Sequence, residues 1–206
     1  GLLTPLEISF FAVIVGVILG FLFAIIRATS DKTGTLKFLN ALVKVYVTII
    51  RGTPVLMQLL IIYYVIFAST NVNKILVAVL AFGLNSAAYM TEIVRSGIMS
   101  IDNGQFEAGR SLGFNYVQTM RHFILPQALK NVLPAIGNEL IVLIKETSIS
   151  GYIGIMDMTR GGDYIRSRTY DAFPPLIAVA IVYLAIVMIL SALVAKLERR
   201  LNRDGK

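Results

Sequence analysis

Four long stretches of this chain contain no charged residue, and they limit what it can fold into more than any other feature. They cover residues 8–26, 52–73, 75–91 and 172–195. A helix of roughly 20 apolar residues crosses the hydrocarbon core of a bilayer, so each stretch can span or nearly span it. A fifth stretch, 131–144, is interrupted only by Glu139. We therefore predict an all-α integral membrane protein with five transmembrane helices.

The overall composition leads to the same class. Hydrophobic residues make up 56% of the 206 positions and charged residues only 15%, whereas about 25% are charged in ordinary soluble domains. One small core cannot bury so much apolar surface, so part of it must face lipid. The chain has no cysteine, which excludes a disulfide framework and a thiolate metal site. We expect a single transmembrane domain over residues 1–206.

The placement of the basic residues predicts the orientation. Lys and Arg near the ends of spans collect on the cytoplasmic side of a membrane. Here they lie in the first connection (Arg27, Lys32, Lys37), the third connection (Arg95, Arg110, Arg121, Lys130) and the tail (Lys196, Arg199, Arg200, Arg203, Lys206). This alternation places the N-terminus outside and the C-terminus in the cytoplasm. The net charge of +7 is thus a topology signal and does not indicate nucleic-acid binding.

Helix boundaries follow from the same runs and from the breakers between them. We predict helices over residues 6–28, 36–68, 74–97, 129–150 and 176–197. Gly16 and Gly20 have the spacing of a helix-packing face in the first. Pro54 lacks a donor N–H and should kink the second, and Pro134 and Gly137 should weaken the fourth. No internal repeat is visible, so an inverted-repeat carrier would need two chains.

The connection 98–130, between the third and fourth predicted helices, carries helix signals of its own. Capping-box patterns begin two segments, Asp102 with Gln105 and Asn115 with Gln118. Gly113 lies between them and suits a left-handed helix end, and Pro126 is expected to end the second segment. We predict two short helices that meet at a glycine outside the membrane and serve as a docking element.

A spaced motif in this connection points to a family. It comprises Glu107-Ala108-Gly109, then Gly113, then Phe123-Ile124-Leu125-Pro126. The motif resembles the cytoplasmic signature of bacterial ABC importer permeases, Glu-Ala-Ala, three residues, Gly, nine residues and Ile-x-Leu-Pro, with every interval kept. Gly109 replaces Ala and Phe123 replaces Ile, which changes bulk more than chemistry.

Further segments are similar to the polar amino-acid branch of that family. They are Ile50-Arg51-Gly52-Thr53-Pro54, Ala88-Tyr89-x-Thr91-Glu92-Ile93-x-Arg95, Gly104-Gln105-x-Glu107-Ala108 and Lys145-Glu146-Thr147-Ser148. The resemblance covers essentially the whole chain, with a local departure at Pro5. It implies a type I ABC importer permease fold in a bacterial plasma (inner) membrane, with residues 102–126 as the coupling segment.

The resemblance also implies partners. These are a second permease subunit (another copy or a close relative), two ATP-binding P-loop subunits and an extracytoplasmic amino-acid-binding protein. The chain itself has no Gly-x4-Gly-Lys-Ser/Thr loop, and its only Gly-Lys pair is Gly205-Lys206. Without a phosphate cradle it should not be an enzyme and should bind no cofactor, ATP and Mg belonging to the partner. The residues expected to couple to that partner are Glu107, Ala108, Gly109, Gly113, Leu125 and Pro126.

A substrate pathway is expected from polar residues within the spans. The candidates are Asn85, Tyr89, Asn138, Glu139 and Asp163. A carboxylate at the position of Glu139 costs several kcal/mol unless it is paired or faces water, and two interpretations stay open. It pairs with Arg51, Lys145 or a freed backbone group, or it faces the substrate.

The outer connection, 145–171, suggests a substrate charge. Asp157 and Asp163 should make an acidic mouth there, and together with Glu139 they favour a basic or polar amino acid such as arginine or histidine. The alternative is that specificity resides mostly in the external binding protein.

Three further residues carry smaller expectations. Glu92 and Arg95, three apart on one helix, should form an ion pair near the cytoplasmic end. For Arg51, bracing of the kink at Pro54 and contact with substrate are both open.

Two other function classes compete with an importer subunit. An ion-coupled carrier or passive channel would explain the spans and buried charges but gives no reason for an ordered cytoplasmic segment. An intramembrane hydrolase ranks last because its motifs are missing.

Overall fold

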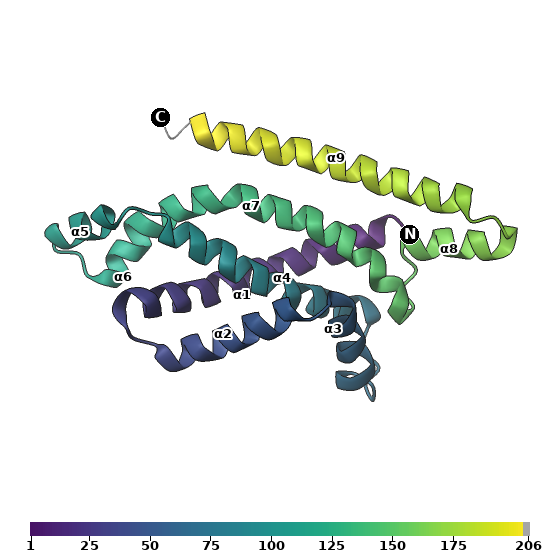
Figure 1. The fold of residues 1–206 in the computed structure, drawn as a ribbon, viewed down its shortest axis with the longest axis horizontal. Helices are drawn as coiled ribbons and strands as arrows, with labels where there is room; N and C mark the ends of the chain where they lie inside the picture. Colours follow the sequence, from purple (N-terminus) through teal and green to yellow (C-terminus); the bar gives the residue numbers. More distant parts are fainter. Residues whose placement is uncertain (204–206) are drawn as a thin grey trace.

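The computed structural model describes residues 1–203, and within them every regular element is a helix or helical turn, as predicted. Lys206 of the basic tail lies outside the described residues. Figure 1 shows the order along the chain. The elements are α1 (Leu3–Thr33), α2 (Lys37–Gly52), α3 (Val55–Ile61), η1 (Ile62–Ile66), α4 (Lys74–Met99), α5 (Asn103–Ser111), α6 (Tyr116–Thr119), η2 (Met120–Ile124), α7 (Leu125–Glu146), η3 (Thr147–Ile153), α8 (Met158–Thr169) and α9 (Phe173–Arg203).

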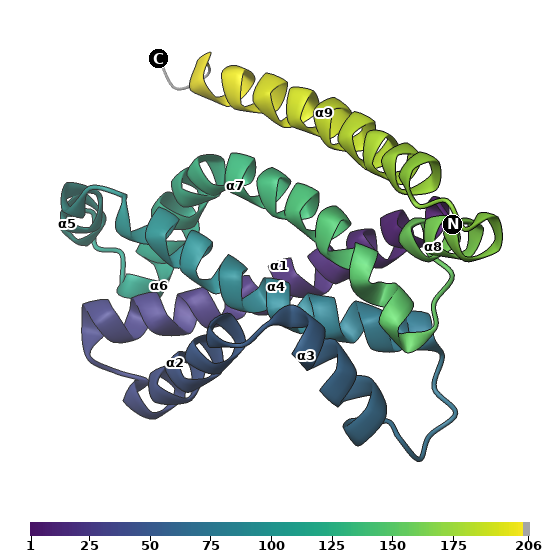
Figure 2. The same cartoon turned by 45° about the vertical axis from the view of Figure 1, so that its right-hand side comes forward.

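Within residues 1–203 three helices, α1, α4 and α9, are long and apolar enough to cross a membrane. A fourth candidate is the pair formed by α2 with α3 and η1, which bends by 107° at a short break. The break lies at Pro54, where a kink was predicted, and Figure 2 shows α2 and α3 diverging from it. The fifth predicted span lies in α7, which carries Lys130, Glu139, Lys145 and Glu146 and is not among these candidates.

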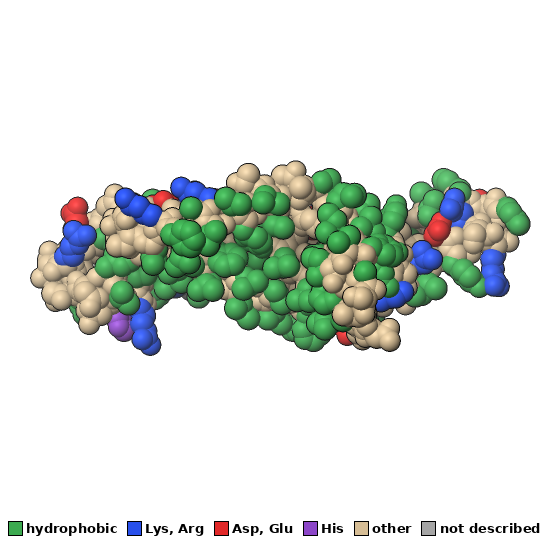
Figure 3. Space-filling model, turned by 90° about the horizontal axis from the view of Figure 1, so that it is seen from below, with side chains coloured by type: hydrophobic (Ala, Val, Ile, Leu, Met, Phe, Trp, Pro, Cys, Tyr) green, Lys and Arg blue, Asp and Glu red, His purple; other side chains and the backbone are tan. Residues whose placement is uncertain are grey.

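The outer surface is apolar where a bilayer would surround it. Figure 3 shows hydrophobic side chains covering the middle of one face, with Lys and Arg gathered toward its two ends. On α9, none of the residues in the most apolar window is buried, and on α1 the side chains of Ile18 and Leu22 are 63% and 53% exposed. Apolar surface on this scale is a surface for lipid or for another membrane chain.

The centre of the fold is a close contact between α1 and α4. The buried positions of α1 include Ala12, Gly16, Gly20, Ala24 and Ala28, four residues apart along one face. A Cβ at Gly16 would come within 2.6 Å of Ser86 Oγ, and one at Gly20 within 2.3 Å of Met90 Cβ. Small residues let two helix backbones approach closely in a membrane. The packing face predicted from the two glycines is therefore confirmed.

The break between α2 and α3 is closed by one side chain. Gln58 Nε2 donates to the carbonyl oxygens of Ile50 (2.7 Å) and Thr53 (3.0 Å) and to Thr53 Oγ1 (2.8 Å). Its Oε1 accepts from Nδ2 of Asn85 at 3.0 Å. Pro54 has no N–H, and carbonyls at a helix end lack helical donors, so within a bilayer they must find partners inside the protein. Gln58 supplies them and ties the break to α4.

Two parts of the chain differ from expectation. Pro126 does not end a helix, because η2 runs directly into α7 and Leu125 N–H donates to the carbonyl of Met120. The π-helical turn η2 widens the backbone here, and Pro126 lies in the first turn of α7. A residue in the first turn of a helix needs no backbone N–H for helical hydrogen bonding. The outer connection, where no helix was predicted beyond residue 150, contains η3 and α8.

We expect Gln58→Leu to lower the unfolding free energy by about 1–3 kcal/mol, since it leaves the carbonyls of Ile50 and Thr53 and the buried Asn85 amide without these partners. The check is the thermal unfolding midpoint in detergent, which should fall by several degrees. Met57→Leu, at an exposed neighbouring position, is the matched control. Equal midpoints for both variants would contradict this role.

Candidate functional site

The coupling segment, residues 102–126, has the predicted caps and the predicted turn at Gly113, but its second helical segment continues through η2 into α7. Asp102 caps α5 by accepting from Gly104 N–H at 2.6 Å, and α6 begins with a complete capping box between Asn115 and Gln118. Gly113 lies between them with φ of +83°, in the left-handed region. The first capping box was wrong in one respect, because the Gln105 side chain instead accepts from Gln127.

The six residues predicted to couple divide into exposed and packed ones. Glu107, Ala108, Gly113 and Pro126 are exposed, whereas Gly109 is buried and Leu125 is half-buried in an apolar cluster. A Cβ at Gly109 would come within 2.6 Å of Thr119 Oγ1. Gly109 therefore lets α5 pack on α6, and its smallness acts within the chain, although the sequence suggested close approach to a partner.

Two exposed apolar residues of the same segment were not predicted. Leu112 and Val117 are each 70% exposed, although they lie beyond the apolar band. The sequence could have indicated them, because they are large apolar residues next to polar helix caps in a connection predicted to lie outside the membrane. Exposed apolar tips of this kind are typical of a protein contact.

The coupling segment is attached to the end of α1. Lys32 donates to Asn103 Oδ1 and lies 4.9 Å above the ring of Phe106, which stacks on Tyr116 at 6.1 Å. The Tyr116 hydroxyl donates to Thr29 Oγ1 at 3.5 Å, and burial raises the pKa of that hydroxyl. Contacts to Thr29 and Lys32, in the last part of α1, thus fix the segment's position.

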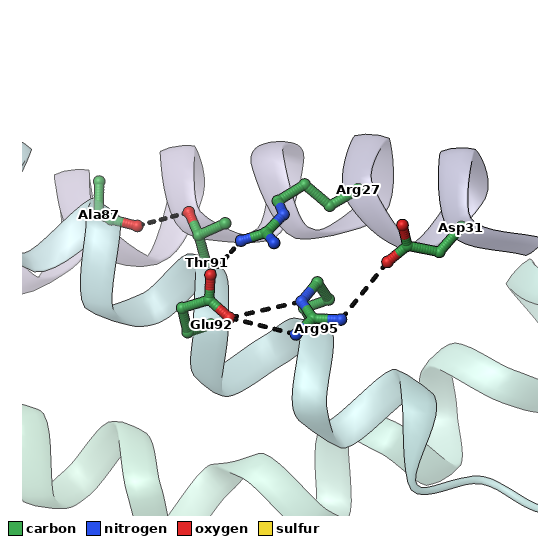
Figure 4. A network of polar contacts seen from close by, with 6 residues as sticks. All are labelled: Arg27, Asp31, Ala87, Thr91, Glu92 and Arg95. Atoms are coloured by element: carbon green, nitrogen blue, oxygen red, sulfur yellow. Dashed lines mark hydrogen bonds and ion pairs between the residues drawn. The ribbon is translucent and has the colours of Figure 1, made fainter. Parts of the chain in front are cut away.

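An ion-pair network joins α1 to α4 close to Lys32 in the sequence (Figure 4). Arg27 pairs with Glu92, and Arg95 lies 3.4 Å from both Glu92 and Asp31. The predicted pair of Glu92 with Arg95 is confirmed. Arg27 and Asp31 were missed as partners, and the available signal was their spacing of four on one helix face.

The polar residues proposed for a pathway on α4 have different surroundings. Asn85 is buried, 3% exposed, and bonded to Gln58. Tyr89 is 36% exposed and lies beneath the guanidinium of Arg51, 5.2 Å from its ring centre.

The two candidates on α7 point in different directions because adjacent helical residues are turned by about 100°. Asn138 is exposed and lines a cleft of about 690 Å³ with other residues of α7, with Ser100 after the end of α4, and with residues of α9. Glu139 is 8% exposed and lies toward Ser86, whose Oγ has no hydrogen-bond partner among the described residues. Within residues 1–203 Glu139 forms no ion pair with Arg51 or Lys145, the partners suggested by the sequence.

The outer connection is less acidic than expected. Asp157 is fully buried, where it caps α8 through Arg160 N–H (2.7 Å) and accepts from Ser150 Oγ (3.3 Å). Burial raises the pKa of its carboxyl. Asp163 is exposed and paired with Arg166, whose Nε donates to it at 2.8 Å. The prediction that Asp157 lines an acidic mouth is wrong, because that side chain is used to start a helix.

Comparisons with known proteins show which family this chain resembles. Residues 13–203 match the family model described as binding-protein-dependent transport system inner membrane component. The arginine transport system permease protein ArtQ of Bacillus subtilis is 38% identical over 99% of this chain and 92% of its own. The glutamine transport system permease protein GlnP of Escherichia coli K12 is 38% identical over 79% of this chain and 76% of its own.

A solved structure extends the likeness to the fold. The crystal structure of an amino acid ABC transporter with histidines superposes with a TM-score of 0.87 at 41% sequence identity. The match covers 97% of this chain and 92% of that one.

We expect Glu92→Gln to destabilise the protein by about 1–3 kcal/mol, because it leaves the half-buried Arg27 without its counter-charge. Arg27→Gln removes that charge, so the double variant should lose less stability than the two single variants summed, by about 0.5–3 kcal/mol. Thermal or denaturant unfolding of all four proteins measures this energy. Additive losses would show that the pair contributes nothing.

Proposed function

The chain belongs to the family of binding-protein-dependent transport system inner membrane components, and we propose that it forms the translocation pathway of an ABC importer for a polar amino acid such as glutamine, arginine or histidine. The substrate class rests on its relatives, which include permeases for arginine and for glutamine. ATP hydrolysis resides in a partner subunit, and the family implies an external binding protein as a further partner.

The observation that carries this function is the ordered coupling segment. It extends beyond the apolar band, presents Leu112 and Val117 to solvent and is attached to α1. A channel or ion-coupled carrier needs no such element, whereas an importer must pass the motion of an ATPase to its membrane helices.

Five spans and one orientation complete the proposal. The spans are α1, the bent pair α2–α3, α4, α7 and α9, in one permease domain that pairs with a second permease subunit. Figure 1 supports an outer N-terminus and a cytoplasmic C-terminus, since the coupling segment and the end of α9 lie at one end of the molecule and the N-terminus and α8 at the other.

In the docked state the exposed residues of the coupling segment touch the ATP-binding subunit. Glu107 and Ala108 contribute from α5, and Leu112, Gly113 and Val117 from the turn and the start of α6. Gly109, Leu125 and Pro126 hold the segment in shape. Force on this surface reaches α1 through Lys32 and Tyr116, and then α4 through Arg27 and Glu92.

The pathway residues serve the substrate in this proposal. Glu139 provides a counter-charge for a cationic substrate, and Asn138, Tyr89 and Asp163 line the route. Asn85 contributes indirectly, because its hydrogen bond holds Gln58 at the break. The competing role for Glu139 is to brace the weak point of α7 near Pro134 and Gly137.

We expect Gly113→Val to reduce substrate-stimulated ATP hydrolysis about tenfold in the complex reconstituted with its ATPase and binding protein. A side chain at a left-handed φ costs roughly 1–2 kcal/mol or more and would tilt α5 against α6. Glu107→Lys, which reverses an exposed charge, should also weaken coupling. The permease alone should hydrolyse no ATP.

Gly34→Val is the matched control for that experiment. Gly34 also has a positive φ, +69°, and open space around it, but it lies in the α1–α2 turn. The docking role is refuted if Gly113→Val and Glu107→Lys stimulate as well as wild type, or if Gly34→Val uncouples equally.

We expect Glu139→Gln to weaken ATPase stimulation by arginine far more than stimulation by glutamine, with little change in thermal stability. The substitution keeps the shape of the side chain and removes its charge, so only a cationic substrate loses a partner. Stimulated hydrolysis with each binding-protein-delivered amino acid measures the difference. Equal losses for both substrates, or an unfolded subunit, would assign Glu139 a structural role.

A further inference from the structure

A cleft between α1, α2 and α4 carries an excess of positive charge. It has a volume of about 320 Å³ and is lined by Arg27, Lys44, Val47, Thr48, Arg51 and Glu92. Three of these residues are cationic and one is acidic. Its lining includes Arg51, three residues before Pro54, and the pair Arg27 and Glu92 that Figure 4 shows.

Two of the three cations have no counter-charge. Arg27 is paired with Glu92, whereas within residues 1–203 neither Lys44 nor Arg51 forms an ion pair or a side-chain hydrogen bond. Lys44, Thr48 and Arg51 recur at helical spacing and so share one face of α2. A charge within a transmembrane segment faces a water-filled cavity or a partner, and here that face is the cleft.

Tyr89 holds Arg51 in place without using its donors. The guanidinium carbon lies 5.2 Å from the centre of the Tyr89 ring. A cation above an aromatic face is attracted by the ring itself, so the N–H groups in the guanidinium plane stay free for an acceptor. Arg51 is therefore oriented and still able to form two parallel hydrogen bonds to a carboxylate.

The depth of the Arg51 guanidinium in the membrane indicates which kind of anion it can bind. Gly20 packs on Met90, so Tyr89, the neighbour of Met90, lies level with the part of α1 near Gly20. The uncharged run of α1 continues for six more residues, to Ile26, which is about 9 Å of helix. A lipid headgroup lies at the membrane surface, whereas a solute crossing the membrane passes this level.

We propose that Arg51, Lys44 and Thr48 form an anion site for the α-carboxylate of the transported amino acid, with Tyr89 as the positioning residue for Arg51. The inference rests on the proposed function. The cleft is large enough for an amino acid, since small-molecule sites begin at about 300 Å³. It recognises the group that all amino acids share, and the Arg27–Glu92 pair forms its cytoplasmic end.

The test compares substrates with and without the carboxylate on the purified transporter complex, without its external binding protein. Binding of L-arginine and of agmatine, its decarboxylated form, is measured, and likewise L-glutamine and 4-aminobutanamide. Wild type should prefer each amino acid. Arg51→Gln should weaken amino-acid binding about 10- to 100-fold, as expected for a lost charged hydrogen bond, and leave the amines unchanged. Arg51→Lys should restore part of the affinity.

Arg199→Gln, on the exposed last turns of α9, is the matched control and should bind both kinds of probe as wild type does. Equal loss of amino acid and amine in Arg51→Gln, or no loss of either, would overturn the site. If the loss occurs only when phosphatidylglycerol is added to phosphatidylcholine vesicles, the anion is a lipid headgroup and the proposal is wrong. Wild type that binds no amino acid would instead refute the proposed function itself.

Discussion

The contact between α1 and α4 is the constraint on which the rest of the structure depends. Gly16 and Gly20 bring the two backbones so close that a single Cβ has no room. Hydrophobic attraction does not hold helices together in lipid, so such packing and a few polar bonds must. The Arg27–Glu92 pair is one of these bonds, and it lies where the helices leave the apolar band. α2, α3 and α7 all pack against α4, and the coupling segment rests on the end of α1.

The parts of the fold that the sequence predicts are those that depend on local chemistry. Uncharged runs locate the long helices, Pro54 locates the break, and Gly113 with the Asn115 cap locates the turn of the coupling segment. Each of these signals acts within a few residues of itself. The notable local failure is Pro126, because a π-helical turn can absorb a proline that would otherwise end a helix.

What the sequence does not predict depends on partners far along the chain. Gln58 carries no motif, yet its side chain bonds the break on one side and Asn85 on the other. In the sequence Asp157 has the features of a free acid in an outer connection. In the fold it is the cap of α8, which begins at the next residue, and it accepts a hydrogen bond from Arg160 N–H. For the same reason the predicted pathway residues lie on several faces. A list of polar residues does not give the rotation of each helix, and the neighbours Asn138 and Glu139 point in different directions, one exposed and one buried.

The glycine contact between α1 and α4 also determines how this protein can move. Two helices that contact each other through long side chains can shift when those side chains change rotamer. Helices packed through glycine have no such side chains between them, so they cannot shift in this way. α1 and α4 should therefore move as one rigid unit, so that a displacement at the end near the coupling segment is carried to the opposite end. The pliable joints must lie elsewhere, at the break held by Gln58 and along α9, which packs mainly on α7 and α8. If the segment couples to an ATPase as proposed, Gly16 and Gly20, far from it in the sequence, determine how much of its displacement reaches the rest of α4.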